Sequence, residues 1–177
     1  AEGSRAWFEA IGEAWGIDSD TVDRVLELPY QRAKRAVAVQ FDKLSGRAVH
    51  FLPDSQLEIP MARFLTEECG VAIKEIGTPY HDALMMSGEL SRLNPDIKVV
   101  EGQDLDPALE RVRSNRPDLT ICGMGIANAL EAEGLRTKWS IELVFSPVQG
   151  FDQAGDLAAL FAKPLVREAI LEVGSWS

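Results

Sequence analysis

The sequence of 177 residues has 28 acidic and 18 basic side chains, a formal net charge of −10, and 46% hydrophobic residues. Its length fits one domain that buries roughly 70% of its unfolded surface, and its acidity argues against nucleic acid or anionic lipid as a partner. Because no apolar run approaches the roughly 18 residues of a membrane span, and the first residues do not resemble a signal peptide, we expect a soluble, cytoplasmic protein.

The first 46 residues have the apolar spacing of helices. Residues 4–15 carry large apolar side chains at helical intervals: Trp7, Phe8, Ile11 and Trp15. Acidic residues begin a second helix over 18–28, where the helix dipole favours them. We expect Pro29 to interrupt this helix, with a further helix over 30–44. Residues 1–46 are therefore predicted to be an N-terminal helical segment.

From residue 47 onward, short apolar runs alternate with helical patterns. Strands are predicted over 47–52, 71–77, 97–102, 118–125 and 139–145, and helices over 54–70, 80–93, 106–116, 128–134 and after Gly150. This alternation is typical of βαβ units with right-handed crossovers. We predict an α/β fold over residues 47–177: an open, doubly wound, Rossmann-like, mainly parallel sheet of about five strands.

Ligands of such sheets bind beyond the carboxyl ends of the strands, near the point where the strand order reverses. The segments at these ends are 53–55, 77–79, 103–104, 123–128 and 146–151. The Gly-x-Gly at 123–125 lacks the third glycine of a dinucleotide fingerprint, and Asp54 and Ser55 are expected to cap the next helix. The corner at 146–151, with its proline, amide and aromatic residue, indicates a pocket wall. The residues alone predict an α/β domain with an unassigned cleft.

The cysteines and histidines do not form a recognisable site. Cys69 and Cys122 lie in unrelated segments without CxxC spacing, so alone they make no zinc or iron–sulfur site. We expect both to be reduced, buried thiols. His50 lies within a strand pattern and His81 at the start of a predicted helix, and we expect structural roles for both.

Several stretches, in this order, resemble the C-terminal part of the N subunits of light-independent protochlorophyllide reductases, a family of nitrogenase-like enzymes. They are FLPDSQLEIPMARFL from Phe51, EIGTPY from Glu75, VVEGQDLD from Val99, and the long run RPDLTICGMGIANALEAEGLRTKWSIELVFSPVQGFDQAGDLAALFAKPLVR from Arg116. The resemblance covers residues 46–167 most specifically.

The resemblance implies the activity of a whole complex. Its N and B subunits would form an N2B2 heterotetramer that binds protochlorophyllide and carries a [4Fe-4S] cluster. An L subunit dimer would be the transient electron donor, using ATP and Mg to reduce the C17=C18 bond of ring D to chlorophyllide a in (bacterio)chlorophyll biosynthesis. The family's cluster-ligating cysteines lie in an N-terminal region that does not match this sequence. We therefore expect this chain alone to bind no cofactor or metal and to be inactive, in the cytoplasm or plastid stroma.

The resemblance also places the corner FSPVQGFDQ in the wall of the pigment cavity. A flat macrocycle needs broad apolar walls and few polar groups. The expected substrate-binding residues are Phe145, Val148, Gln149, Gly150, Phe151 and Asn128. Family members have His where Gln149 stands and Pro where Ala129 stands, and Gln cannot ligate or titrate as His does.

Three alternatives remain open at this stage. The corner could be a packed loop whose phenylalanines belong to the core. The chain could belong to another nitrogenase-like reductase or a cofactor-assembly subunit, or it could be a free-standing Rossmann-like binding module without a redox role.

Overall fold

A single sheet of five parallel strands forms the centre of the molecule. The computed structural model describes residues 1–102 and 104–171, so Gln103 lies outside the described residues. The strand order is β3-β2-β1-β4-β5. The strands are β1 (Ala48–Phe51), β2 (Ala72–Thr78), β3 (Lys98–Glu101), β4 (Leu119–Cys122) and β5 (Thr137–Trp139). All four neighbouring pairs are parallel, which confirms the predicted doubly wound α/β fold.

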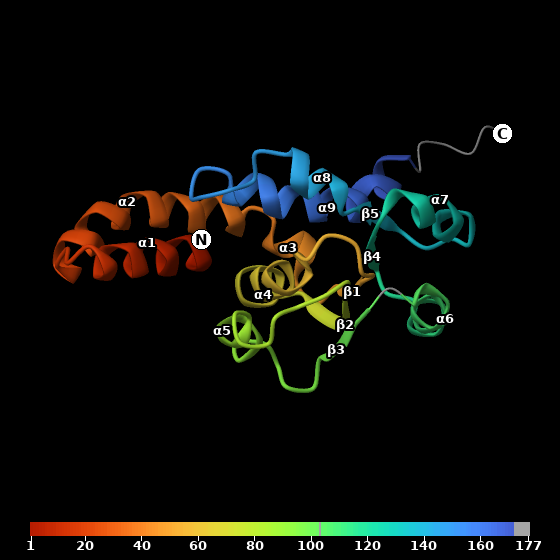
Figure 1. Ribbon diagram of the computed structural model, residues 1–177. Helices are drawn as coiled ribbons and strands as arrows, with labels where there is room; N and C mark the ends of the chain where they lie inside the picture. The colour runs from red at the N-terminus through yellow and green to blue at the C-terminus, as the bar shows by residue number, and fades with distance from the viewer. Residues whose placement is uncertain (103, 172–177) are drawn as a thin grey trace.

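Helices cover both faces of the sheet. Val49 and Phe51 of β1 pack into the core beneath α4 (Glu58–Cys69) and α9 (Ala154–Leu171). The other face carries a smaller apolar cluster beneath α6 (Leu105–Asn115) and α7 (Met124–Ala132). Figure 1 shows α4 and α5 (Ser87–Leu90) on one side of the sheet and α6 and α7 on the other. This placement follows from right-handed crossovers on both sides of β1.

The N-terminal helices form a hairpin that projects beyond the sheet (Figure 1). It consists of α1 (Glu2–Ala14) and α2 (Ser19–Ala38), and α3 (Phe41–Leu44) follows. Asp18 caps α2, because its carboxylate accepts the N–H of Thr21 at 2.8 Å.

The predicted interruption at Pro29 is wrong, since α2 continues through it. Leu26 precedes the proline and Ala33 and Val37 follow it, and all three are buried in the main core. Their burial offsets the backbone hydrogen bond that proline cannot make. The same core includes residues of β1, and the boundary after residue 46 stays a prediction.

The predicted strand over 139–145 is also wrong. β5 ends at Trp139, and Ile141–Phe145 form a short helix, α8. Trp139 pairs with Cys122, the last residue of β4, so the residues beyond it have no neighbouring strand. The alternating apolar pattern over 141–145 reflects a half-buried helical turn.

The predicted helices over 80–93 and 128–134 have different bounds in the structure. Within 80–93 only Ser87–Leu90 are helical, and the side chain of Asp82 holds the preceding turn by accepting the N–H groups of Leu84 and Met85, both at 2.9 Å. The helix predicted over 128–134 begins earlier, at Met124, and Gly123 separates it from β4. Among the described residues, no helix has the length and apolar character needed to cross a membrane.

Candidate functional site

The strand order reverses between β1 and β4. The chain passes from β1 to β2 and β3 on one side, and then to β4 and β5 on the other side of β1. The connections that follow β1 and β4 therefore lead into helices on opposite faces. In doubly wound folds the crevice between two such connections is the usual ligand site.

Asp54 connects the loops at this switch point. Its carboxylate accepts a hydrogen bond from the hydroxyl of Ser140, which directly follows β5. A Cβ atom added at Gly123, directly after β4, would lie 2.7 Å from Asp54 Oδ1. Glycine at this position therefore allows the close approach of the carboxylate, and the ends of β1, β4 and β5 are held together.

Glu58 fixes the rest of the loop after β1. Its carboxylate is buried, with the residue 2% exposed, and Oε1 accepts the N–H groups of Asp54 at 3.0 Å and Ser55 at 2.6 Å. Oε2 accepts the hydroxyl of Thr78, at the end of β2, at 3.1 Å. These bonds offset the desolvation of a buried carboxylate. Asp54 and Ser55 do not cap α4 as predicted, because the helix begins at Glu58 after Leu57.

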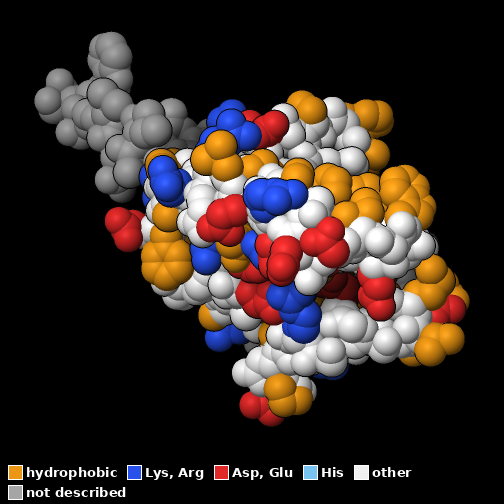
Figure 2. Space-filling view, turned by 90° about the vertical axis from the view of Figure 1, so that its left-hand side faces the viewer, with side chains coloured by type: hydrophobic (Ala, Val, Ile, Leu, Met, Phe, Trp, Pro, Cys, Tyr) orange, Lys and Arg blue, Asp and Glu red, His pale blue; other side chains and the backbone are white. Residues whose placement is uncertain are grey.

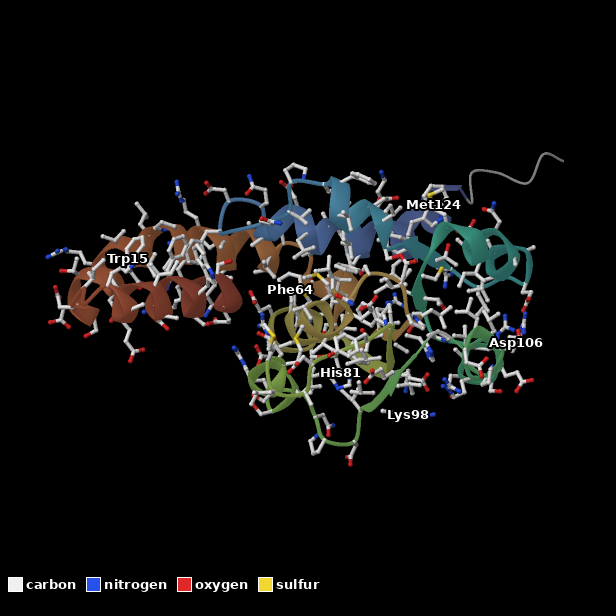
Figure 3. All side chains as sticks on the ribbon, in the orientation of Figure 1. Trp15, Phe64, His81, Lys98, Asp106 and Met124 are labelled. Atoms are coloured by element: carbon white, nitrogen blue, oxygen red, sulfur yellow. The ribbon has the colours of Figure 1, made fainter. Side chains whose placement is uncertain are left out.

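A cavity of about 230 Å³ lies beside the corner after α8. Its lining includes Met61, Arg63 and Phe64 of α4 and Val148, Gln149 and Gly150 of the corner. Figure 3 shows Phe64 near the middle of the molecule. Complete small-molecule pockets have roughly 300–1,000 Å³, so this cavity is smaller than a complete ligand pocket, and its lining forms a wall beside the corner.

Arg63 contributes a buried cation to this wall. Burial disfavours its charge, but hydrogen bonds to Glu89 and Glu67 outweigh that effect and raise the pKa of the guanidinium. Glu67 also accepts two bonds from Arg92, at 2.9 and 2.7 Å. The charge of Arg63 is therefore balanced within the protein. The network joins α4 to α5 and to Arg92, which follows α5.

The structure brings only some of the predicted substrate-binding residues together. Val148, Gln149 and Gly150 line the cavity, and Gly150 has a φ of 78°, which favours glycine. Phe151 is buried, and its ring stacks on Phe8 with 5.9 Å between centroids.

The other two predicted residues lie elsewhere. Phe145 is 80% exposed on α8. Asn128 is exposed on α7, on the opposite face of the sheet from the cavity. Neither residue lines the cavity.

Sequence reasoning missed one exposed apolar residue at the strand ends. Trp139 ends β5 and is 38% exposed. Met124, within the predicted segment 123–128, follows Gly123 at the start of α7 and is also exposed. Figure 3 shows Met124 and Phe64 on opposite sides of the sheet. The predicted last strand, over 139–145, begins where β5 ends, so Trp139 was expected at the start of the strand and not at its carboxyl end.

The far end of the hairpin is distinct from this site. Trp15 is exposed there, away from the sheet (Figure 3), and a hollow of about 460 Å³ between α1 and α2 is lined partly by Glu9, Glu13 and Asp23. Figure 2 shows the molecule from the side on which the hairpin lies in Figure 1. Acidic and basic side chains are interspersed over the middle of this face, and hydrophobic side chains gather along one edge. The paired charges and the distance from the strand ends separate this surface from the candidate site.

The two cysteines do not fit an iron–sulfur cluster. Both are buried free thiols, as predicted, and they lie in different apolar clusters. Burial raises the pKa of each thiol to about 12, which disfavours the thiolate that ligates iron. Among the side chains that the structure describes, those of residues 1–102 and 104–166, no group of three or more Cys, His, Asp or Glu is arranged to hold a metal ion.

Comparisons with known proteins agree on one family. The family model "Nitrogenase component 1 type Oxidoreductase" matches residues 1–165. Light-independent protochlorophyllide reductase subunit N of Halorhodospira halophila is 55% identical over 97% of this chain. The proteins of the same name from Acidiphilium rubrum and Prochlorococcus marinus strain NATL1A are 55% and 54% identical over 98% and 96% of it.

Solved structures show the same fold at low identity. A structure titled "Nitrogenase Cp1 at pH 6.5" superposes with a TM-score of 0.76 at 16% identity, covering 99% of this chain and 40% of the other. The chain spans 40–41% of the length of the three protochlorophyllide reductase relatives.

Proposed function

The chain belongs to the nitrogenase component 1 type oxidoreductases, and on this basis we propose that it is the C-terminal part of subunit N of a light-independent protochlorophyllide reductase. The observation that carries the proposal is its 54–55% identity, over at least 96% of its length, to three proteins of that name. The proposed role of the chain is to form one wall of the protochlorophyllide pocket.

The proposed reaction adds two electrons and two protons across the C17=C18 bond of ring D, giving chlorophyllide a. The electrons arrive one at a time from an L subunit dimer that uses ATP and Mg, and they originate outside this chain. The [4Fe-4S] cluster of the full complex takes no ligand from the residues described here, whose cysteines are buried and protonated. The tasks left to this chain are to bind and orient the pigment and to exclude water from it.

The pocket wall is proposed to lie along the carboxyl edge of the sheet. Trp139 and Val148 offer apolar surface for the macrocycle, and the amide of Gln149 offers a hydrogen bond. Gly150 sets the turn between them and the helix α9. Phe151 supports the corner from behind, because its ring is packed against the hairpin.

The exposed apolar residues beyond this wall suit contact with a partner subunit. Val144 and Phe145 of α8 are largely exposed, and Asn128 provides an exposed amide on α7. We assign these residues to the boundary between the pigment and the B subunit of an N2B2 heterotetramer. The L subunit dimer joins this assembly transiently.

Reconstitution of the full-length N subunit with B and L tests the proposal. In the dark, with Mg-ATP and a chemical reductant, the complex is expected to convert protochlorophyllide to chlorophyllide, followed by absorbance. Omission of ATP, or of the N subunit, is the control and should stop conversion. An assembled complex that neither binds nor reduces protochlorophyllide would contradict the proposal. Reduction of chlorophyllide instead would place the chain in another nitrogenase-like reductase.

A further inference from the structure

Gln56 has an unusual backbone conformation at the switch point. Its φ is 68°, a left-handed value that residues with a Cβ atom adopt at a cost. Arg116 is the other non-glycine residue with positive φ among the described residues. Arg116 is the C-cap of α6, where this conformation is common, whereas Gln56 precedes α4 and has no such explanation.

The surrounding loop holds Gln56 in this conformation. The buried carboxylate of Glu58 accepts the N–H groups of Asp54 and Ser55, on one side of Gln56. On the other side, Leu57 donates its N–H to the hydroxyl of Ser55 at 3.3 Å. The loop is thus fixed by a carboxylate that is itself anchored to the end of β2, and an outlier held in this way points to a function.

The side chain of Gln56 is free to contact a ligand. It is exposed, and its amide has no hydrogen-bond partner within the part of the chain that the structure describes. It lies between Asp54, which contacts Ser140 at the end of β5, and the first turn of α4. The positive end of the α4 dipole favours partial negative charge near this position.

We propose that Gln56 is a substrate-orienting residue whose amide N–H₂ donates a hydrogen bond to a peripheral carbonyl or carboxylate oxygen of the tetrapyrrole. This inference rests on the proposed function. A macrocycle held mainly by apolar walls takes its orientation from a small number of polar contacts. A rigid amide beside the strand ends supplies such a contact without reorganisation on binding.

Three variants of the full-length subunit, each assembled with B and L, test the proposal. Gln56→Gly removes the amide and relieves the backbone conformation. Gln56→Glu keeps the shape of the side chain and replaces the donor with an acceptor. Arg116→Gly is the matched control, because it relieves the other positive φ at a residue that precedes β4 and lies away from the carboxyl ends of the strands. Thermal unfolding, the dissociation constant of protochlorophyllide, and kcat and KM are measured for each.

The expected results separate binding from folding. Gln56→Gly should melt no lower than the wild type but bind the pigment about tenfold more weakly, the loss expected for one hydrogen bond to a polar oxygen. Gln56→Glu should bind at least as weakly as Gln56→Gly, and Arg116→Gly should bind normally. Unchanged pigment binding in both Gln56 variants would overturn the inference. Absence of pigment binding by the wild-type complex would instead overturn the proposed function itself.

Discussion

Among single residues, Glu58 has a central structural role in the candidate site. Its carboxylate joins the loop after β1 to the end of β2 by accepting hydrogen bonds from Asp54, Ser55 and Thr78. Its position, four residues after Asp54, places it at the start of α4 facing back toward the loop. The same carboxylate therefore supports both the strand ends and the conformation of Gln56.

Replacing Glu58 should destabilise the fold. Glu58→Ala removes the acceptor of two N–H groups and of the hydroxyls of Ser55 and Thr78, and we expect a loss of about 3 kcal/mol in the free energy of unfolding. Glu58→Gln keeps part of the network and should cost about 1 kcal/mol. Urea denaturation measures both. Exposed Glu110, on α6, supplies the control, and Glu110→Ala should change stability by less than about 0.5 kcal/mol. Equal stability of the two alanine variants would refute this role.

His50 is a second buried residue with a testable consequence. Its ring is fully buried in β1 beside Thr120 of β4, and neither nitrogen has a hydrogen-bond partner within the described chain. Burial, and the nearby cations Arg111 and Lys98, lower its pKa from 6.5 to about 4, although Glu75, 3.6 Å away, opposes the shift.

The lowered pKa predicts acid sensitivity. Because the unfolded chain binds this proton more readily, the stability contribution is complete above pH 6.5 and is lost as the pH falls toward 4. Between pH 7 and 4.5, the wild type should lose about 2 kcal/mol more than His50→Leu. Urea denaturation at both pH values measures this difference. Parallel pH profiles of the two proteins would show that His50 does not contribute.

The candidate residues were only partly predictable. Val148, Gln149 and Gly150 could be located because proline and glycine mark a corner between elements. Gln56 and Trp139 could not, since positive φ in a residue other than glycine leaves no compositional signal, and the exposure of Trp139 depends on where β4 ends.

Among the elements, α2 and α9 form the most extensive contact between the hairpin and the rest of the fold, and Ala1 and Glu2 also bind Glu68 of α4. A Cβ atom at Gly155, near the start of α9, would lie 2.7 Å from Ala36 Cβ and 3.2 Å from its carbonyl carbon. Backbone-to-backbone packing this close requires glycine.

This close contact predicts opposite effects for two Gly→Ala substitutions in helices. Gly155→Ala forces α9 away from α2 and should cost about 1–3 kcal/mol. Gly125→Ala, at the matching position of α7, meets no atom within 4 Å and should gain up to about 1 kcal/mol from helix propensity. Thermal or urea unfolding distinguishes them. Stabilisation by both substitutions would show that α2 and α9 do not pack this closely.

The predictions of helices and strands failed where tertiary contacts, and not the local sequence pattern, determine which element forms. Residues 141–145 alternate as a strand would, but the sheet offers them no partner, so they form α8. Pro29 is tolerated within α2 because apolar residues on both sides of it are buried. Long periodic segments such as α4 and α6 were predicted correctly because their pattern and their packing agree.

At the scale of the whole molecule, the order of strands and helices was sufficient to predict the fold. Alternating β and α patterns permit few topologies once crossovers are right-handed and short, and the observed order of five parallel strands is one of them. The candidate site could not be predicted to the same depth, because the chain spans 41% of the first two relatives, and the cavity beside the corner depends on how α4 and the corner pack together.

The position of the pigment in the proposed reductase complex tests the central claim most directly. We predict that a structure of the full complex with bound protochlorophyllide will show the macrocycle in van der Waals contact with Trp139. We also predict a hydrogen bond from the amide of Gln149 or Gln56 to one of its peripheral oxygens. A macrocycle bound without contact to any residue at the carboxyl edge of this sheet would contradict the account.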